Sequence, residues 1–100
     1  MRAILIDPVA KTVTDTLVAS KVRDIYACIG SEEMDTVQLR RQEHLHFGYP
    51  YAEAPVPGFI ISGHSHVIRG KAVVLGDEGG SACDTLLTAD YLRPTIRFVS

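Results

Sequence analysis

The stretch Lys71-Ala72-Val73-Val74-Leu75 determines how the rest of the chain is interpreted, because it is a continuous apolar run. A short run of this kind is typical of a β-strand that is buried on both faces. Gly76-Asp77-Glu78-Gly79-Gly80 follows directly, and its glycines predict a flexible turn. We therefore expect a central strand over residues 71–75 and its end at residue 76.

Two runs near the N-terminus predict a hairpin. Ala3–Ile6 is apolar and ends at Asp7-Pro8, which is typical of a buried strand closed by a turn. Apolar residues and threonines alternate over Thr12–Val18. β-Branched residues with a period of two are typical of a half-exposed strand. We expect the two strands to pair around Pro8–Lys11.

One helix is predicted after this hairpin. Ser20 is a suitable N-cap, and Gly30 is a suitable residue to end the helix. The apolar residues between them recur at the spacing of one helical face, namely Val22, Ile25, Tyr26 and Ile29. Because so short a helix is not stable alone, we expect Ile25 and Ile29 to pack on the sheet over the central strand.

The remaining sequence consists of short strands and irregular segments. Strands are expected over 36–39, 44–47, 59–61 and 95–99, with one helical turn over 88–92 capped by Thr88. Arg40–Glu43 is expected to form a polar turn. Gly48–Gly58 holds three prolines, which remove backbone donors and predict an irregular loop. Gly63–Gly70 is expected to form a second loop.

These elements predict a single α+β domain over residues 1–100. One hundred residues can bury one core and leave no room for a second domain. The expected architecture is a mixed or antiparallel sheet of about six or seven short strands, with one main helix packed on one face.

Composition restricts the classes of function. Hydrophobic residues make up 46% and charged residues 22%, as in globular domains. The net charge of -2 argues against nucleic-acid binding, which usually needs a basic patch. No apolar run reaches the length of a membrane span or a signal peptide. We therefore expect a cytoplasmic protein with no membrane partner, in which Cys28 and Cys83 are buried free thiols.

Several segments resemble a family of short proteins of unknown function that are carried by bacteriophages, prophages and plasmids. The similar segments are Met1-Arg2-Ala3-Ile4-Leu5-Ile6-Asp7-Pro8, Lys11-Thr12-Val13-Thr14, Ile25-Tyr26, Ile29-Gly30, the run from Ile68 to Gly79, and Ile96-Arg97-Phe98-Val99. The resemblance implies an accessory protein of a mobile element in a bacterial host. It implies no activity, substrate or catalytic residue, and residues 42–67 depart from the family pattern.

The four histidines occur as two H-x-H units, His44-Leu45-His46 and His64-Ser65-His66. On a strand, H-x-H places both imidazoles on one face. Two such units on neighbouring strands could bind zinc, whereas one unit on a solvent face and one in a loop would not. We expect the second arrangement, with no metal and no cofactor.

Catalytic motifs are incomplete. Gly63-His64-Ser65-His66-Val67 approaches the nucleophile elbow G-x-S-x-G, but Val67 stands at the second glycine position. The glycines at 76–80 form no phosphate-binding loop, because no G-K-[ST] follows. Asp77 and Glu78 are expected to be solvent-exposed. The sequence therefore favours a protein that is not an enzyme.

The candidate binding residues gather between residues 40 and 66. Tyr49 and Tyr51 flank the proline-rich loop. Aromatic side chains on a rigid loop are well suited to contact a partner, because they lose little conformational entropy on binding. Arginines beside the histidines could form an edge that binds anions. The complete candidate set is Arg40, Arg41, His44, His46, Tyr49, Tyr51, His64 and His66.

Three functions remain open from the sequence. The first is non-enzymatic binding of a host protein, in a counter-defence role, through a flat aromatic face. The second is binding of a small anionic molecule or nucleotide signal, in a pocket lined by histidine together with Arg40, Arg41 or Arg69. The third is metal-dependent hydrolysis by the paired histidines. A flat face, a pocket or a converging set of imidazoles would distinguish them.

Overall fold

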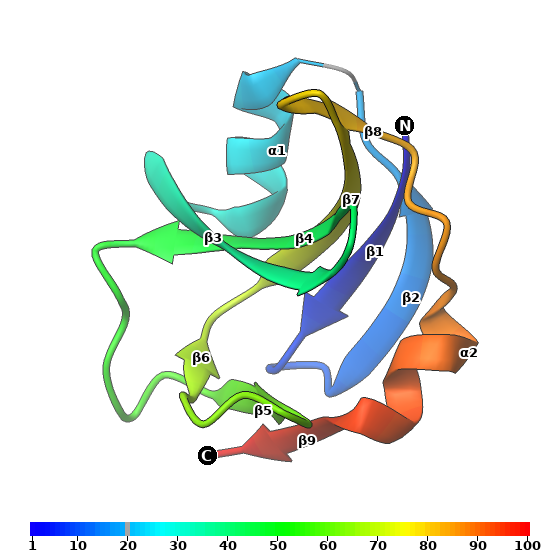
Figure 1. Ribbon diagram of the computed structural model, residues 1–100. Helices are drawn as coiled ribbons and strands as arrows, with labels where there is room; N and C mark the ends of the chain where they lie inside the picture. The colour runs from blue at the N-terminus through cyan, green and yellow to red at the C-terminus, as the bar shows by residue number, and fades with distance from the viewer. Residues whose placement is uncertain (20) are drawn as a thin grey trace.

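The computed structural model describes residues 1–19 and 21–100, apart from the side chain of Val22, and the expected N-cap Ser20 therefore lies outside the described residues. The described residues form nine strands, two α-helices and one 3-10 turn (Figure 1). In chain order these are β1 (Arg2–Asp7), β2 (Thr12–Leu17), α1 (Val22–Ile29), β3 (Glu33–Arg40), β4 (Glu43–Tyr49), β5 (Gly58–Ile61), β6 (Ile68–Arg69), β7 (Ala72–Glu78), β8 (Ser81–Cys83), α2 (Ala89–Leu92), the 3-10 turn (Arg93–Thr95) and β9 (Ile96–Val99).

The larger sheet has the strand order β2-β1-β7-β4-β3, and β8 pairs with the end of β7. All its pairings are antiparallel. The position of β7 between β1 and β4 confirms the central strand that the apolar run predicted. The N-terminal hairpin is also confirmed, with Ile6 opposite Val13. The α+β class is therefore correct, and the sheet is antiparallel.

A second, smaller sheet with the order β6-β5-β9 was not predicted. The larger sheet has six strands, as expected, but the expectation of a single sheet is wrong. Ile68 and Arg69 form a strand inside the predicted 63–70 loop and pair with β5 in the second sheet. Gly58 allows this pairing: a Cβ at that position would lie 2.6 Å from the Ile68 carbonyl oxygen. The close approach of β5 and β6 thus requires a residue without a side chain.

Two apolar clusters lie on opposite faces of the larger sheet. The cluster between the two sheets contains Ile4, Leu45 and Phe59, all fully buried. The cluster on the other face contains Ile25 and Ile29 of α1 together with Val73 and Leu75 of β7. Residues of β7 alternate between these clusters, since Ala72 and Val74 belong to the first. Strand β7 is thus buried on both faces.

Helix α1 ends as its sequence predicts. Gly30 adopts a left-handed conformation with φ of 79°, and its N–H donates to the Tyr26 carbonyl at 2.8 Å. Glycine reaches this conformation without strain, so it is the usual residue after a helix. Both cysteines are free, but Cys28 and Cys83 are half-buried rather than buried. No helix of the described residues is long and apolar enough to span a membrane.

Two expected turns are partly strand. Residues Gly76–Glu78 continue β7, and the turn is confined to Gly79 and Gly80. A Cβ at Gly76 would lie 2.5 Å from the Asp84 carbonyl oxygen, so the glycine at 76 serves close packing rather than flexibility. Glu43, expected in a polar turn, begins β4 and is only 4% exposed.

The buried Glu43 carboxylate has two partners from the segment that follows β8. Oε1 accepts a hydrogen bond from the Thr85 hydroxyl, and Oε2 accepts one from the Leu86 N–H at 3.2 Å. The Thr85 hydroxyl oxygen in turn accepts from the Leu87 N–H at 3.1 Å. A buried carboxylate is tolerated where hydrogen bonds satisfy its oxygens. This network therefore fixes the chain that leads into α2.

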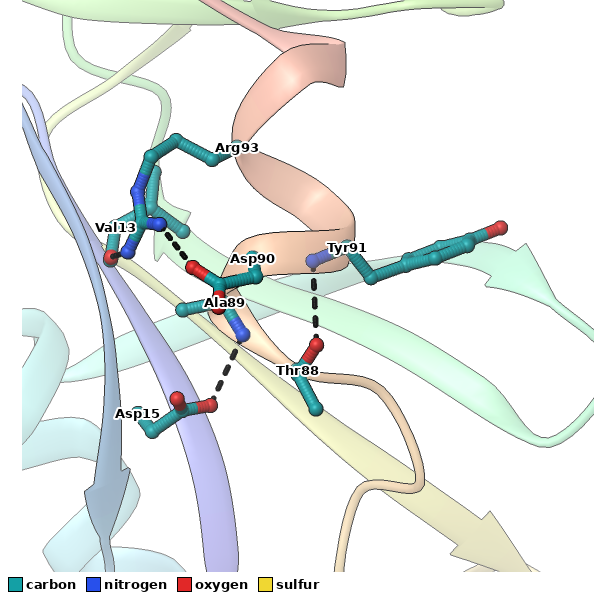
Figure 2. Close-up of polar contacts among 7 residues, drawn as sticks. All are labelled: Val13, Asp15, Thr88, Ala89, Asp90, Tyr91 and Arg93. Atoms are coloured by element: carbon teal, nitrogen blue, oxygen red, sulfur yellow. Dashed lines mark hydrogen bonds and ion pairs between the residues drawn. The ribbon is translucent and has the colours of Figure 1, made fainter.

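Helix α2 and the turn that follows it are bound by hydrogen bonds to β2, at the edge of the larger sheet (Figure 2). Oδ1 of Asp15 on β2 accepts from the Ala89 N–H at 2.9 Å, and Arg93 Nη2 donates to the Val13 carbonyl at 2.7 Å. Thr88 caps the helix as predicted, its hydroxyl accepting the Tyr91 N–H at 3.2 Å. Because β9 follows directly, these contacts set where the smaller sheet lies.

Candidate functional site

A pocket of about 290 Å³ lies where the end of the larger sheet meets the smaller sheet. Its lining residues come from β3, β4, the start of the proline-rich loop, the 62–67 loop and β6. Figure 1 labels these strands in the ribbon diagram. We call the pocket the inter-sheet pocket; its lining residues are Val37, Phe47, Gly48, Tyr51, Ala52, His64, His66, Val67, Ile68 and Arg69. Two other hollows, near Ile60–His64 and near Cys83, are more open to solvent.

The walls of the inter-sheet pocket are mainly apolar. Val37 and Phe47 come from neighbouring strands of the larger sheet, Val67 comes from the end of the 62–67 loop, and Ile68 comes from β6 of the smaller sheet. Val67 is 40% exposed, so this wall also reaches the surface. Apolar walls with a few convergent polar groups are characteristic of small-molecule sites.

Tyr51 connects the proline-rich loop to the larger sheet. Its hydroxyl donates to Oδ2 of Asp35 on β3 at 2.5 Å, and its ring centroid lies 6.0 Å from that of Phe47. The Tyr51 hydrogen bond, with one from the Thr36 N–H, lowers the pKa of Asp35, and the same phenol–carboxylate bond raises the pKa of Tyr51. The loop is therefore held against the pocket by a neutral phenol and an ionised carboxylate.

Arg69 lies on the opposite side of the pocket. Its Nη1 donates to the Val56 carbonyl at 2.7 Å and to the Ser100 carbonyl at 3.2 Å. These two bonds hold the guanidinium between the proline-rich loop and β9. Its position is thus set by the fold before any ligand binds.

The structure brings half of the sequence-predicted residues together. Tyr51, His64 and His66 line the inter-sheet pocket. Tyr49 stands beside them, 47% exposed, with its ring edge-on to Tyr51 at a centroid distance of 5.3 Å. Arg69, which the sequence suggested only as one possible phosphate contact, belongs to the same site. The functional roles of these residues stay predictions.

The other histidine pair lies on the opposite face of the larger sheet. Leu45 belongs to the cluster between the sheets, so His44 and His46 point the other way along β4. Their cross-strand partners Leu75 and Val73 belong to the cluster under α1. The two H-x-H units therefore do not converge. Within residues 1–19 and 21–100, no group of three or more His, Cys, Asp or Glu side chains could hold a metal ion.

The two candidate arginines are also apart from the pocket. Arg40 Nη1 donates to the Tyr91 hydroxyl at 2.8 Å, and its guanidinium carbon lies 5.4 Å from the centre of that ring. The pairing of β3 with β4 shifts register between Gln38 and Arg40. Arg41 is exposed in the turn that follows. Arg40 thus connects β3 to α2, and neither arginine contributes to the pocket lining.

His46 should make stability depend on pH. Its Nδ1 is buried without a hydrogen-bond partner, and burial, followed by the neighbouring His44, lowers its pKa, while Asp77 partly opposes this. The unfolded chain therefore binds a proton more readily than the folded one, so stability is present above about pH 6.5, the usual histidine value, and falls as pH drops through the lowered value.

The test is chemical denaturation of the wild type and His46→Phe at pH values on either side of that window. We expect the variant to lose part of the pH dependence, while its free energy of unfolding in neutral buffer changes by less than about 1.5 kcal/mol. Replacing the exposed His66 with glutamine is the control and should leave the pH slope unchanged. An unaltered slope in His46→Phe would contradict the expectation.

Comparison of the chain with protein-family models, with curated proteins and with solved structures found no significant match. The basis for a functional proposal is therefore the chemistry of the inter-sheet pocket itself. Its polar side chains come from two separate segments, the proline-rich loop and residues 64–69, which the fold brings together.

Proposed function

We propose that this protein binds a small molecule in the inter-sheet pocket. The observation that carries the proposal is a pocket of about 290 Å³, partly open to solvent, with apolar walls and a few polar side chains. Ligand sites are concave and mainly apolar, and their polar groups fix the orientation of the ligand. A pocket lined by histidine and arginine is also the feature that separates this function from binding through a flat face.

The wider setting is part of the same proposal. The resemblance of the N-terminal strand region and of residues 68–79 to short phage, prophage and plasmid proteins supports an accessory role in a bacterial cytoplasm. Sequestration of a small host molecule would suit a protein without a complete catalytic motif. In that setting, ligand binding would itself be the counter-defence activity.

A second candidate function is binding of a host protein at the rim of the pocket. Tyr49 and Tyr51 are 47% and 60% exposed and pack edge to face, and Val56 is 39% exposed in the same loop. Exposed aromatic residues on a rigid loop are common anchors of protein interfaces. The metal-dependent alternative receives no such support, because the two histidine pairs lie on opposite faces.

Filling the pocket should abolish small-molecule binding. Ala52 is exposed and lines the pocket, so Ala52→Phe places a ring in the opening without disturbing the core. We expect a panel of single-ring fragments to shift the backbone amide NMR signals of Phe47, Val67 and Ile68 in the wild type. The same fragments should bind Ala52→Phe at least about tenfold more weakly, a loss near 1.4 kcal/mol.

Ala10→Phe is the matched control, because Ala10 is exposed in the turn between β1 and β2 and does not line the pocket. It should bind the fragments like the wild type. If no fragment shifts the pocket signals at millimolar concentration, or if both variants bind alike, small-molecule binding at this site is wrong and the exposed tyrosines become the leading site.

A further inference from the structure

Apart from the phenol of Tyr51, whose pKa is raised, the ionisable side chains that line the inter-sheet pocket are all basic. They are His64, His66 and Arg69, and no Asp or Glu lines the pocket in the part of the chain that the structure describes. The chain as a whole has a net charge of -2, so the local character is opposite to the overall one. The acid beside the pocket is Asp35, whose Oδ2 is bonded to the Tyr51 hydroxyl. The pocket therefore favours an anion over a cation.

No Asp or Glu side chain among the described residues forms an ion pair with Arg69. Its Nη1 donates to the Val56 carbonyl and to the main-chain oxygen of Ser100. The ion pair that the described residues do form joins Arg93 to Asp90, where Arg93 also donates to the Val13 carbonyl of β2. Arginine presents five N–H donors in a planar fork, so a guanidinium held by one nitrogen still offers donors to an anionic oxygen.

The apolar part of the pocket is suited to a flat ring. The Phe47 and Tyr51 rings are inclined by 35° with centroids 6.0 Å apart, and Val67 and Ile68 stand opposite. The volume of about 290 Å³ lies just below the range of about 300–1,000 Å³ that is usual for ligand pockets. A ligand of one or two fused rings suits this space better than a dinucleotide does.

Building on the small-molecule function proposed above, we infer that the ligand is a small aromatic anion. Its ring would lie against Phe47 and Tyr51, with a carboxylate or phosphate group directed to Arg69 and the two histidines. Carboxylate and phosphate share the chemistry that guanidinium and imidazole N–H donors recognise. The inference is therefore one ring system that carries one anionic group.

The test compares two anions with a neutral compound, and benzoate and benzamide differ in charge but hardly in shape. Benzoate, phenyl phosphate and neutral benzamide are titrated into the full chain, and binding is followed at the amide signals of Phe47, Val67 and Ile68. We expect at least one of the two anions to bind about five times more tightly than benzamide, or better, because hydrogen bonds to charged groups are stronger than neutral ones. Which anion binds more tightly identifies the anionic group.

Two variants assign the preference to the pocket. Replacing both His64 and His66 with glutamine should reduce the anion preference to about twofold or less while benzamide affinity is kept. Arg23→Gln, on the exposed side of α1, removes one positive charge elsewhere and should leave the preference unchanged. A preference that drops equally in both would show a general charge effect and overturn the inference.

The outcomes separate this inference from the proposed function. If all three compounds bind with equal affinity, the anion class is wrong and the small-molecule pocket stands. If none of them shifts the pocket signals, the inference of a ligand with one ring is wrong. The fragment panel with Ala52→Phe then tests whether the pocket binds any small molecule. If a preferred anion binds as tightly to the double histidine variant, its recognition does not involve the histidines and the assignment fails.

Discussion

Phe59→Ala should lower the free energy of unfolding by about 3–5 kcal/mol, which is the usual cost of truncating a buried phenylalanine. Phe59 lies on β5 and is fully buried in the cluster between the two sheets. Alanine would remove contacts from both sheets at once and leave a cavity that the backbone pairing of β5 cannot close. Urea denaturation of the two proteins in neutral buffer measures the difference.

Phe98→Ala provides a matched control for this expectation. Phe98 lies directly opposite Phe59 on β9, but it is only half-buried. The same chemical change should therefore cost clearly less there, because less apolar surface is lost. Equal losses at 59 and 98, or a loss below about 1 kcal/mol at 59, would contradict the description of Phe59 as the residue that holds the two sheets together.

Ile25→Ala should cost about 2–5 kcal/mol, because Ile25 is 2% exposed and lies in the cluster with Val73 and Leu75. The helix has only eight residues, so packing rather than helix propensity provides most of its stability. Arg23→Ala, on an exposed position of the same helix, should change stability by no more than about 0.5 kcal/mol. Thermal or urea unfolding followed by circular dichroism compares them.

A loss below about 0.5 kcal/mol in Ile25→Ala would place Ile25 at the surface. It would also mean that α1 turns a different face to the larger sheet. Arg23→Ala controls for a change in helix propensity, because both substitutions introduce alanine within one turn of the same helix. A large loss in both variants would point to the helix as a whole rather than to its buried face.

Local patterns in the sequence predicted the elements that local physics controls. The apolar run at 71–75 identified β7, the apolar run ended by Asp7-Pro8 identified β1, and alternating residues identified β2. Gly30 and Thr88 ended and capped the helices as expected. In each case the sequence pattern lies within a few consecutive residues, so residue types and spacing were sufficient.

The features that the sequence did not predict depend on distant partners. Ile68–Arg69 is too short to show a period, and it is a strand only because it pairs with Gly58 and Phe59. Glu43 was expected in a polar turn, and its burial depends on Thr85 in a distant segment. Neither partner could be chosen from spacing alone, because closure of such long loops carries no local signal.

The candidate site shows the same division. Tyr51, His64 and His66 were selected because polar and aromatic residues on loops often contact ligands, and all three line the pocket. Alternation along β4 correctly placed both of its histidines opposite Phe47. The alternation along β4 could not show that the 62–67 loop lies on the same face of the larger sheet as Phe47. That placement depends on the smaller sheet, which was not predicted. The apolar residues Val37 and Val67 carried no functional signal in the sequence.

The central position of β7 has a consequence for synthesis on the ribosome. Ile4 pairs with Val74, and Leu45 also pairs with Val74 from the other side, so one late segment joins both early hairpins. Until residues 72–76 leave the ribosome, β1 and β4 can each pair only with the other strand of their own hairpin, and the edges that pair with β7 stay unpaired. Unpaired strand edges make incompletely folded chains prone to aggregation. The larger sheet should therefore form only after β7 has been synthesised and can pair with β1 and β4.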